Sequence, residues 1–251
     1  MARIIAFANQ KGGVAKTTST VSIAAALAEA GRRVLAVDID PQGALTYSLG
    51  VDPDDLQETV NDVLVRRLPI EKVIITREVD LVPANIDLAG AEAVLLAKTG
   101  REYALERALR DVTGRYDFVL IDCPPSLGIL TINGLTAAQE VVIPLQCEAL
   151  SHRGVGQLLE TMRDIRHFTN PHLEIAGIIP TMYDGRTRHA REVLEDVGER
   201  YSVRVLEPVV KKSIRFAEAT QAGRSILRYA PNHPGSESYR QLAARLEGGP
   251  A

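Results

Sequence analysis

The stretch Asn9-Gln-Lys-Gly-Gly-Val-Ala-Lys-Thr-Thr18 joins an apolar run, Ile4–Ala8, to an alanine-rich run, Thr17–Ala30. The apolar run predicts a buried strand, and the alanine-rich run predicts a helix. A strand, a glycine-rich turn, a Lys-Thr pair and a helix form the context that a phosphate-binding loop requires. Successive backbone amides and a helix N-terminus then create a concave patch of positive partial charge, which suits an oligophosphate.

Side chains of the same loop add two kinds of chemistry. Lys16 supplies a positive charge for the β- and γ-phosphates, and the Thr17 hydroxyl can ligate Mg²⁺, which prefers oxygen ligands. A second lysine, Lys11, lies at the front of the loop. The alternative interpretation is a glycine-rich turn with coincidental lysines. We predict the following nucleotide-binding residues in the loop: Lys11, Gly12, Gly13, Val14, Ala15, Lys16, Thr17 and Thr18.

The order Lys-Gly-Gly-x-x-Lys-Thr resembles the deviant Walker A motif of the ParA/MinD family of P-loop ATPases. The resemblance implies that ATP and Mg²⁺ bind here and that Lys16 and Lys11 act in catalysis. It also implies that Lys11 reaches across a dimer interface to the phosphates of the other subunit. Gln10 stands where the standard phosphate-loop pattern has glycine, and Ala15 stands where the family usually has glycine. If residue 15 needs a positive φ, alanine costs about 1 kcal/mol there.

An acidic residue follows a second apolar run of strand type. Asp122 ends the run Phe118–Ile121 and begins Asp-Cys-Pro-Pro-Ser. An acid at the tip of a strand beside the phosphate-binding loop is where a Walker B residue holds the hydration shell of Mg²⁺, and the Asp-x-Pro-Pro-Ser form is similar to that of the family. The alternative is an aspartate that only initiates the turn before two prolines.

A pair of aspartates follows a third apolar run, Val34–Val37. Asp38 and Asp40 are two residues apart, which places both side chains on one face. The resemblance assigns Asp40 a catalytic role, in which it orients the attacking water, and assigns Asp38 a supporting role. A loop acid together with a helix-capping acid is the alternative. The predicted metal ligands are therefore Thr17, Asp38 and Asp122.

The composition is that of an ordinary globular protein. The chain has 251 residues, of which 45% are hydrophobic and 24% are charged. We expect a single domain over residues 1–251, since no Pro/Gly/Ser-rich linker and no internal repeat is evident. Two cysteines, Cys123 and Cys147, are too few for a disulfide framework, and the absence of a signal sequence or a long apolar run favours a cytoplasmic protein without a membrane segment.

Strands and helices alternate along the whole chain. The strands are continuously apolar, which predicts an α/β fold with one doubly wound, mostly parallel sheet and helices on both faces, as in P-loop NTPases. Further predicted strands are 72–75, 80–82, 140–145, 173–181 and 203–206. Short helices are expected within 44–71, and further predicted helices are 87–97, 102–112, 127–137, 151–168, 187–200, 214–222 and 236–246, the last with Ser236 as N-cap.

The net charge of −3 gives no global nucleic-acid signal, but the charge is uneven. The window 186–228 holds ten Lys/Arg and six Asp/Glu. A basic C-terminal third on an acidic body indicates a polyanion-binding surface, although a solvated helical face is an equal alternative. The resemblance places the stretch 181–187 near the adenine and lets its arginine face DNA. It also places the stretch 211–219 over the base, with Lys-Lys-Ser in place of the family's Pro-Arg-Asn.

These two stretches supply the remaining predicted site residues. The predicted base contacts are Met182, Lys211 and Ser213. The predicted DNA contacts are Arg186, Arg188, Lys211, Lys212 and Arg215. Contacts of this kind go to the phosphate backbone, so they are independent of sequence and sensitive to salt.

The resemblance implies a ParA/Soj-type chromosome or plasmid partitioning ATPase. ATP and Mg²⁺ would favour a sandwich homodimer that binds double-stranded DNA without sequence preference on the nucleoid. A ParB-type partner protein would stimulate slow hydrolysis and release the protein from DNA. Three alternatives stay open: a MinD-like membrane-cycling regulator of division-site placement, an electron donor like the nitrogenase iron protein, and a scaffold that does not hydrolyse ATP.

Overall fold

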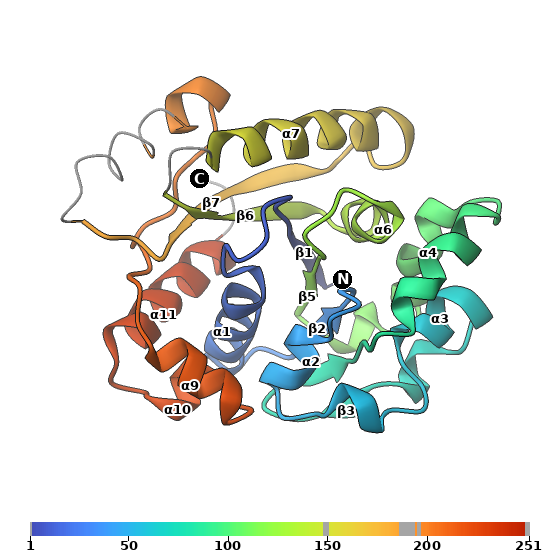
Figure 1. Ribbon diagram of the computed structural model, residues 1–251, viewed down its shortest axis with the longest axis horizontal. Coiled ribbons are helices and arrows are strands. Elements are labelled where there is room, and N and C mark those ends of the chain that lie inside the picture. The colour runs from blue at the N-terminus through green and yellow to red at the C-terminus, as the bar shows by residue number, and fades with distance from the viewer. Residues whose placement is uncertain (1, 148–150, 186–193, 195–196, 249–251) are drawn as a thin grey trace.

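The computed structural model describes residues 2–147, 151–185, 194 and 197–248. Within these ranges a seven-stranded sheet has the order β3-β4-β2-β5-β1-β6-β7 (Figure 1). Neighbouring strands are parallel except for β3 and β4, which are antiparallel. The strands are β1 (Arg3–Phe7), β2 (Val34–Asp38), β3 (Ile75–Thr76), β4 (Asp80–Val82), β5 (Phe118–Asp122), β6 (Glu140–Gln146) and β7 (Glu174–Thr181).

Helices cover both faces of this sheet (Figure 1). The α-helices are α1 (Lys16–Glu29), α2 (Ala44–Ser48), α3 (Val60–Arg66), α4 (Leu88–Leu96), α5 (Ala104–Arg110), α6 (Ile129–Ala137), α7 (Ser151–Phe168), α9 (Arg215–Gln221), α10 (Ile226–Tyr229) and α11 (Pro234–Glu247). Short 3₁₀ turns lie at Pro53–Asp55, Ile70–Lys72, Arg101–Tyr103 and Thr113–Arg115. In the described ranges, no helix combines the length and apolar character needed to span a bilayer.

Successive residues of the central strands enter different hydrophobic cores. Ile4 and Ala6 of β1 pack with α3 to α7, whereas Ile5 and Phe7 pack with α1, α2 and the C-terminal helices. Strand residues alternate between the two faces of a sheet, so a strand buried on both faces must be apolar at every position. This is why β1, β2 and β5 read as continuous apolar runs. The predicted fold class, a mostly parallel sheet with helices on both faces, is confirmed.

Two predicted strands are wrong in their extent. Residues 72–75 were expected to form a strand, but a 3₁₀ turn occupies Ile70–Lys72 and only Ile75–Thr76 pairs with β4. The amides of Lys72 and Val73 donate to the carbonyls of Pro69 and Ile70 within the turn, at 3.0 and 3.1 Å, so they are not available to a strand ladder. Residues 203–206 form no named strand, although Val205 makes an isolated parallel bridge to Ile178 on β7. The predicted helix 187–200 lies mostly outside the described residues.

The predicted N-cap of the last helix is also wrong. Helix α11 begins earlier, at Pro234, and the Nδ1 atom of His233 accepts a hydrogen bond from the Gly235 amide. Ser236 instead lies inside the helix and donates its hydroxyl proton to the Ala230 carbonyl at 2.7 Å. Proline is favoured at the first position of a helix because its missing N–H would be unpaired there in any case.

Two glycines with positive φ join the C-terminal helices to α2. Gly50 follows α2 with φ 77° and Gly223 follows α9 with φ 61°. The two backbones are so close that a Cβ on Gly223 would lie 2.7 Å from the Gly50 Cα. Neither position therefore tolerates a side chain.

We expect Gly223→Ala to lower the free energy of unfolding by about 2 kcal/mol or more, because it combines left-handed backbone strain with a backbone clash. Gly90→Ala in α4 is the matched control. A Cβ there meets nothing within 4 Å, so it should raise stability by about 0.5–1 kcal/mol, as alanine does in a helix interior. Urea unfolding of both variants measures the difference. Equal effects of the two changes would contradict the packing argument.

Candidate functional site

The ends of three neighbouring strands bring the predicted site residues together. Strand β5 lies between β1 and β2, and its last residue, Asp122, is in register with Phe7 on one side and Asp38 on the other. The loop that leaves β1 and the Asp38–Asp40 stretch that leaves β2 therefore start beside Asp122. Ligands of open α/β sheets bind at this position, outside the carboxyl ends of the strands.

The loop from Asn9 to Lys16 is held by the ends of two further strands. The Asn9 side chain is buried and donates from Nδ2 to the Pro144 carbonyl on β6 at 2.8 Å, while its Oδ1 accepts from the Lys11 amide at 3.0 Å. The Thr181 hydroxyl on β7 donates to the Val14 carbonyl at 2.9 Å. These bonds fix both halves of the loop, so its amides are ordered in the free protein.

Two loop residues adopt the left-handed backbone conformation. Gly13 has φ 72°, and Ala15, the N-cap of α1, has φ 62° and ψ 37°. Residue 15 does need a positive φ, so alanine costs about 1 kcal/mol at this position, as expected from the sequence. The loop still forms, because the Ala15 carbonyl accepts the Ser19 amide at 3.0 Å and starts the helix.

The first turn of α1 is tied to the tip of β5. Thr17 donates its hydroxyl proton to Asp122 Oδ2 at 2.6 Å, and the Thr20 hydroxyl lies 3.1 Å from Asp122 Oδ1. A hydroxyl and a carboxylate side by side at a helix N-terminus are the oxygen ligands that Mg²⁺ uses when it also binds phosphates and water. In the described ranges, no group of three or more His, Cys, Asp or Glu side chains forms a metal cage. The residues present therefore fit a phosphate-bound Mg²⁺, which needs only one or two protein ligands.

The two aspartates after β2 have different partners. Asp38 is fully buried; its Oδ2 accepts from the Thr46 amide at 2.9 Å and the Thr46 hydroxyl at 2.7 Å, and its Oδ1 accepts from the Asp40 amide. Both Asp38 oxygens are thus engaged by protein donors, so Asp38 fixes the start of α2. Asp40 uses only Oδ1, which accepts from the Gln42 amide at 3.0 Å. Its second oxygen makes it the better candidate for orienting a water molecule.

Burial and mutual repulsion shift the ionisation of the aspartates. Burial, aided by the nearby Asp38 and Asp40 charges, raises the pKa of Asp122 to about 8. Burial also raises the pKa of Asp38 to about 7, although hydrogen bonds from Thr46 oppose the shift. A divalent cation and Lys16 together would favour the ionised carboxylates. In the nucleotide-free protein, Asp122 and Asp38 are therefore harder to ionise than exposed aspartates.

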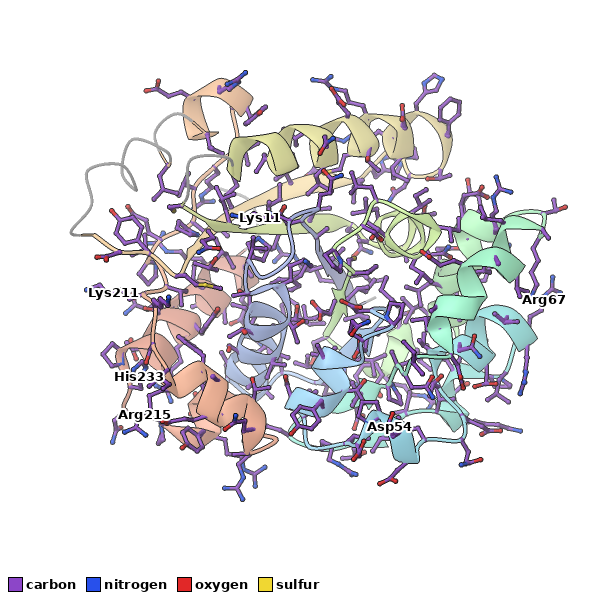
Figure 2. The ribbon with its side chains drawn as sticks, in the orientation of Figure 1. Lys11, Asp54, Arg67, Lys211, Arg215 and His233 are labelled. Carbon is purple, nitrogen blue, oxygen red and sulfur yellow. The ribbon has the colours of Figure 1, made fainter. Side chains whose placement is uncertain are left out.

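Lys16 is folded back over the loop. Its side chain is buried, and its Nζ donates to the Lys11 carbonyl at 3.3 Å. Burial lowers the pKa of Lys16, while Asp122 and Asp40 act in the opposite direction. Lys11 lies at the outer end of the loop, next to exposed Gly12 and Gly13 and close to the first described turn of α7 at Gly154 (Figure 2). The outer end of the loop thus carries Lys11, whereas Lys16 is buried beneath the same loop.

A pocket of about 250 Å³ opens beside the loop. It is lined on one side by Ala15 and Thr18 and on the other by segments from the C-terminal third of the chain. The predicted base contacts all line this pocket, together with apolar neighbours: Met182, Lys211, Ser213, Val210 and Phe216. An apolar slot with a few polar groups, adjacent to a phosphate-binding loop, is a suitable place for a purine base.

The predicted DNA contacts fall into two sets. Arg186 and Arg188 lie outside the described residues. Lys211, Lys212 and Arg215 are exposed at one edge of the molecule, where Figure 2 shows Lys211 and Arg215 on the same side. Arg215 forms an exposed ion pair with Glu218 at 2.7 Å, so its charge is partly compensated.

Several site residues were not predicted from the sequence. Asn9, Thr20, Thr46 and Thr181 position the loop and the aspartates through long-range hydrogen bonds. His233 Nε2 lies 3.1 Å from the Ser213 hydroxyl and so supports one wall of the base pocket. Thr46, just after the Asp-Pro-Gln-Gly loop, could have been recognised as a partner for an acid, but nothing local signals the other four.

Comparisons with known proteins agree with this geometry. The model of a family described as an AAA domain matches residues 2–175. The sporulation initiation inhibitor protein Soj of Bacillus subtilis is 45% identical over 98% of this chain and 98% of its own length. The chromosome partitioning protein ParA of Myxococcus xanthus is 42% identical over 97% of this chain and 87% of its own length.

A solved structure is similar over almost the whole fold. It is described as cobyrinic acid a,c-diamide synthase from Mycobacterium smegmatis with bound ATP analog and magnesium. It superimposes with a TM-score of 0.89 at 51% identity and covers 98% of this chain and 95% of its own. Taken with the loop, the two strand-end aspartates and the strand order, these matches show that the chain belongs to the ParA/Soj-type family of P-loop ATPases and is an ATP hydrolase.

Proposed function

We propose that the protein is a DNA-partitioning ATPase that acts as an ATP-gated switch, with residues 1–251 as one ATPase domain. The observation that carries the proposal is the hydrogen bond between Thr17 and Asp122 at the start of α1. The loop from Asn9 to Lys16 carries both lysines and enters this helix through Ala15, whose φ is positive. ATP is the nucleotide, and Mg²⁺ supplies charge neutralisation at the phosphates when bound. The curated relatives with the names Soj and ParA support the cellular role.

Each site residue takes a role that its contacts allow. The loop amides of residues 12–17 cradle the phosphates, and Lys16 exchanges the Lys11 carbonyl for a phosphate oxygen. Thr17 and Asp122 hold the Mg²⁺ shell, Asp38 positions the stretch that carries Asp40, and Asp40 orients the attacking water. Phosphoryl transfer needs mainly positioning and electrostatic stabilisation, which these groups provide.

The proposed active form is a homodimer. Gly12 and Gly13 are exposed, and Lys11 lies at the same outer surface of the loop. A second copy that faces this surface would bring its own Lys11 to the bound phosphates and would bury the exposed glycines. Nucleotide that binds the dimer better than the monomer shifts the population to the dimer, as a switch requires.

The dimer is proposed to bind double-stranded DNA without sequence preference, and a ParB-type partner is proposed to stimulate hydrolysis and release. The exposed cations at the edge of the base pocket, Lys211, Lys212 and Arg215, support a phosphate-contacting surface. The segment 211–213, which carries two of these cations, also lines the nucleotide pocket. A nucleotide bound in that pocket would therefore fix the position of these cations. Nucleoid association would follow from DNA binding.

A membrane-cycling role is less well supported. The last described helix, α11, buries Tyr239, Leu242, Ala243 and Leu246 against α1 and its neighbours. The Tyr239 hydroxyl also lies 2.9 Å from the Ser19 hydroxyl of α1. A helix whose apolar face is already packed in the core does not offer that face to lipid.

Corrinoid amidation, the activity in the description of the Mycobacterium smegmatis structure, is not carried over. A synthase that used a cysteine nucleophile would need an accessible, activated thiolate. Cys123 is fully buried, and burial raises the pKa of its thiol, while burial raises the pKa of Cys147 to about 11. An iron–sulfur cluster shared between subunits needs cysteines at the surface, whereas Cys123 is fully buried.

The first test concerns the two lysines. Calorimetry should detect ATP binding with Mg²⁺ in the natural protein, and Lys16→Gln should weaken it at least tenfold. Lys11→Gln should leave nucleotide binding within about threefold yet abolish nucleotide-dependent dimerisation in sedimentation. Lys72→Gln, in the 3₁₀ turn far from the loop, is the control. Dimerisation that persists in the Lys11 variant would refute the proposed role of that residue.

The second test uses pH. The folded protein binds protons on Asp122 and Asp38 that the unfolded chain has already released, so stability of the nucleotide-free protein falls as pH rises from 5 to 8. Each pH unit between the unfolded and folded pKa values is worth about 1.4 kcal/mol per group, so we expect the Tm to drop by about 10 °C or more over that range. Asp122→Asn should reduce the slope. Asp117→Asn should not, because Arg33 holds the pKa of Asp117 at about 2.

The third test concerns DNA. ATP-dependent retardation of unrelated duplexes should be lost on double charge reversal, Arg186→Glu with Arg215→Glu, and natural binding should weaken steeply with salt. Arg110→Glu, an exposed arginine on α5, serves as the matched control. Unchanged DNA binding in the double variant would place the DNA surface elsewhere, and ATP-dependent pelleting with anionic vesicles would favour the membrane-cycling alternative.

A further inference from the structure

A second cavity lies far from the nucleotide site. Its volume is about 380 Å³, and it is formed by α3, α4, α5 and the segments that connect them. Figure 2 shows Arg67, which lines this cavity, at the opposite side of the molecule from Lys211, which lines the base pocket. The proposed ATPase mechanism uses none of the residues that line it.

Positive charge gathers around this cavity although the chain as a whole is acidic. Four of its lining side chains are cationic, Arg67, Lys98, Arg101 and Arg107, and one is anionic, Asp111. Arg101 pairs with Glu102 at 3.0 Å. Among the described residues, no carboxylate lies within ion-pair distance of the other three cations. Their charge is therefore not neutralised by a direct ion pair.

Backbone carbonyl groups hold three of these cations in place, Lys98, Arg101 and Arg107, without cancelling their charge. Arg107 Nη2 donates to the Gly100 carbonyl at 3.0 Å, and Arg101 Nη1 donates to the Leu96 carbonyl at 2.6 Å. Lys98 Nζ donates to the Val65 carbonyl. Cations that are already ordered lose less conformational entropy when an anion binds, so such an arrangement favours binding.

The backbone around the cavity adopts conformations that allow this arrangement. Gly100 has φ 64°, and a Cβ at that position would lie 3.2 Å from Arg107 Nη1, so glycine permits the close approach. Arg67 ends α3 with φ 59°, a conformation that is uncommon for a residue other than glycine. Helices commonly end in a residue of this conformation, so at Arg67 it marks the end of α3 beside the cavity.

The remaining wall of the cavity is apolar. Leu64, Ile70 and Leu95 are buried core residues that also line it, and Ala104 and Ala108 of α5 are small enough to leave the space open. The cavity thus combines an apolar wall with cationic groups, and its volume lies within the range of small-molecule sites, about 300–1,000 Å³. A bare inorganic anion would leave the apolar wall uncovered.

We propose that this cavity, between α3, α4 and α5, binds a small organic anion: a phosphate or carboxylate group on an apolar body of about one ring. The anionic group would contact Arg67 and Arg107, and the apolar body would lie against the partly exposed Leu68 and Ala108. This site is independent of the proposed partitioning function, because it shares no lining residue with the nucleotide pocket.

Phenyl phosphate is a suitable probe, and calorimetry is the measurement. The experiment uses the full chain saturated with a non-hydrolysable ATP analogue and Mg²⁺, so that the nucleotide site is occupied. We expect saturable one-to-one binding of phenyl phosphate and at least tenfold weaker binding of either inorganic phosphate or phenol. The proposal is overturned if phenyl phosphate does not bind, or if inorganic phosphate binds equally well.

Two kinds of variant locate the binding. The double change Arg67→Gln with Arg107→Gln should weaken phenyl phosphate binding at least tenfold, whereas Arg110→Gln, on the same helix but paired with Glu106 and outside the cavity, should not. Ala108→Phe should fill the cavity and weaken binding independently of charge. If that variant does not fold, the arginine pair still decides. Binding that is unchanged in the arginine double variant would overturn the proposal.

Discussion

The structure depends on one buried hydrogen-bonded contact between a strand end and a helix start. Asp122 ends the central strand β5 and accepts hydroxyl protons from Thr17 and Thr20 in the first turn of α1. An acid buried so completely is unstable when ionised unless it is paired. Here the pairing supplies both structure and chemistry, because the hydroxyl that satisfies the carboxylate is also the one that can join it around a magnesium ion. That bond ties the start of α1, and with it the end of the phosphate-binding loop, to the tip of β5.

The sequence predicts this arrangement well wherever a signal is local. Continuous apolar runs identify β1, β2 and β5, and the aspartates that end β2 and β5 identify the edge of the sheet where chemistry can occur. Residues that act through long-range contacts are invisible in a single sequence. Asn9 and Thr181 meet the loop only because β6 and β7 fold beside it, 135 and 167 residues away in the chain. The bounds of the edge strand β3 were also predicted wrongly, because a strand of two residues is too short to show an alternation of apolar and polar residues.

Ala15 shows how a local rule and the global fold can disagree. The backbone conformation at the N-terminus of α1 requires a positive φ, for which glycine is best suited, yet this chain has alanine. A strain of about 1 kcal/mol is small beside the burial of the helix that follows, in which Ile23 and Leu27 are fully buried. The loop is therefore determined by the packing of α1 and by the bonds from β6 and β7, more than by the preference of residue 15.

The two ends of a bound nucleotide would be held by parts of the chain that are distant in sequence. In the proposed mode of binding, the phosphate end belongs to the first helix and its loop, and the base end lies in the pocket lined by Met182 and Phe216. Without ligand, these parts are connected at the site by the Thr181–Val14 and Ser19–Tyr239 hydrogen bonds. A ligand that contacts both parts adds its binding free energy to that connection, since it stabilises only the state in which they are correctly docked. The exposed cations of the Lys211–Arg215 segment belong to the same wall of the pocket. The proposed switch therefore needs no direct contact between the phosphates and these cations, because a ligand that fixes the pocket wall also fixes the segment that carries them.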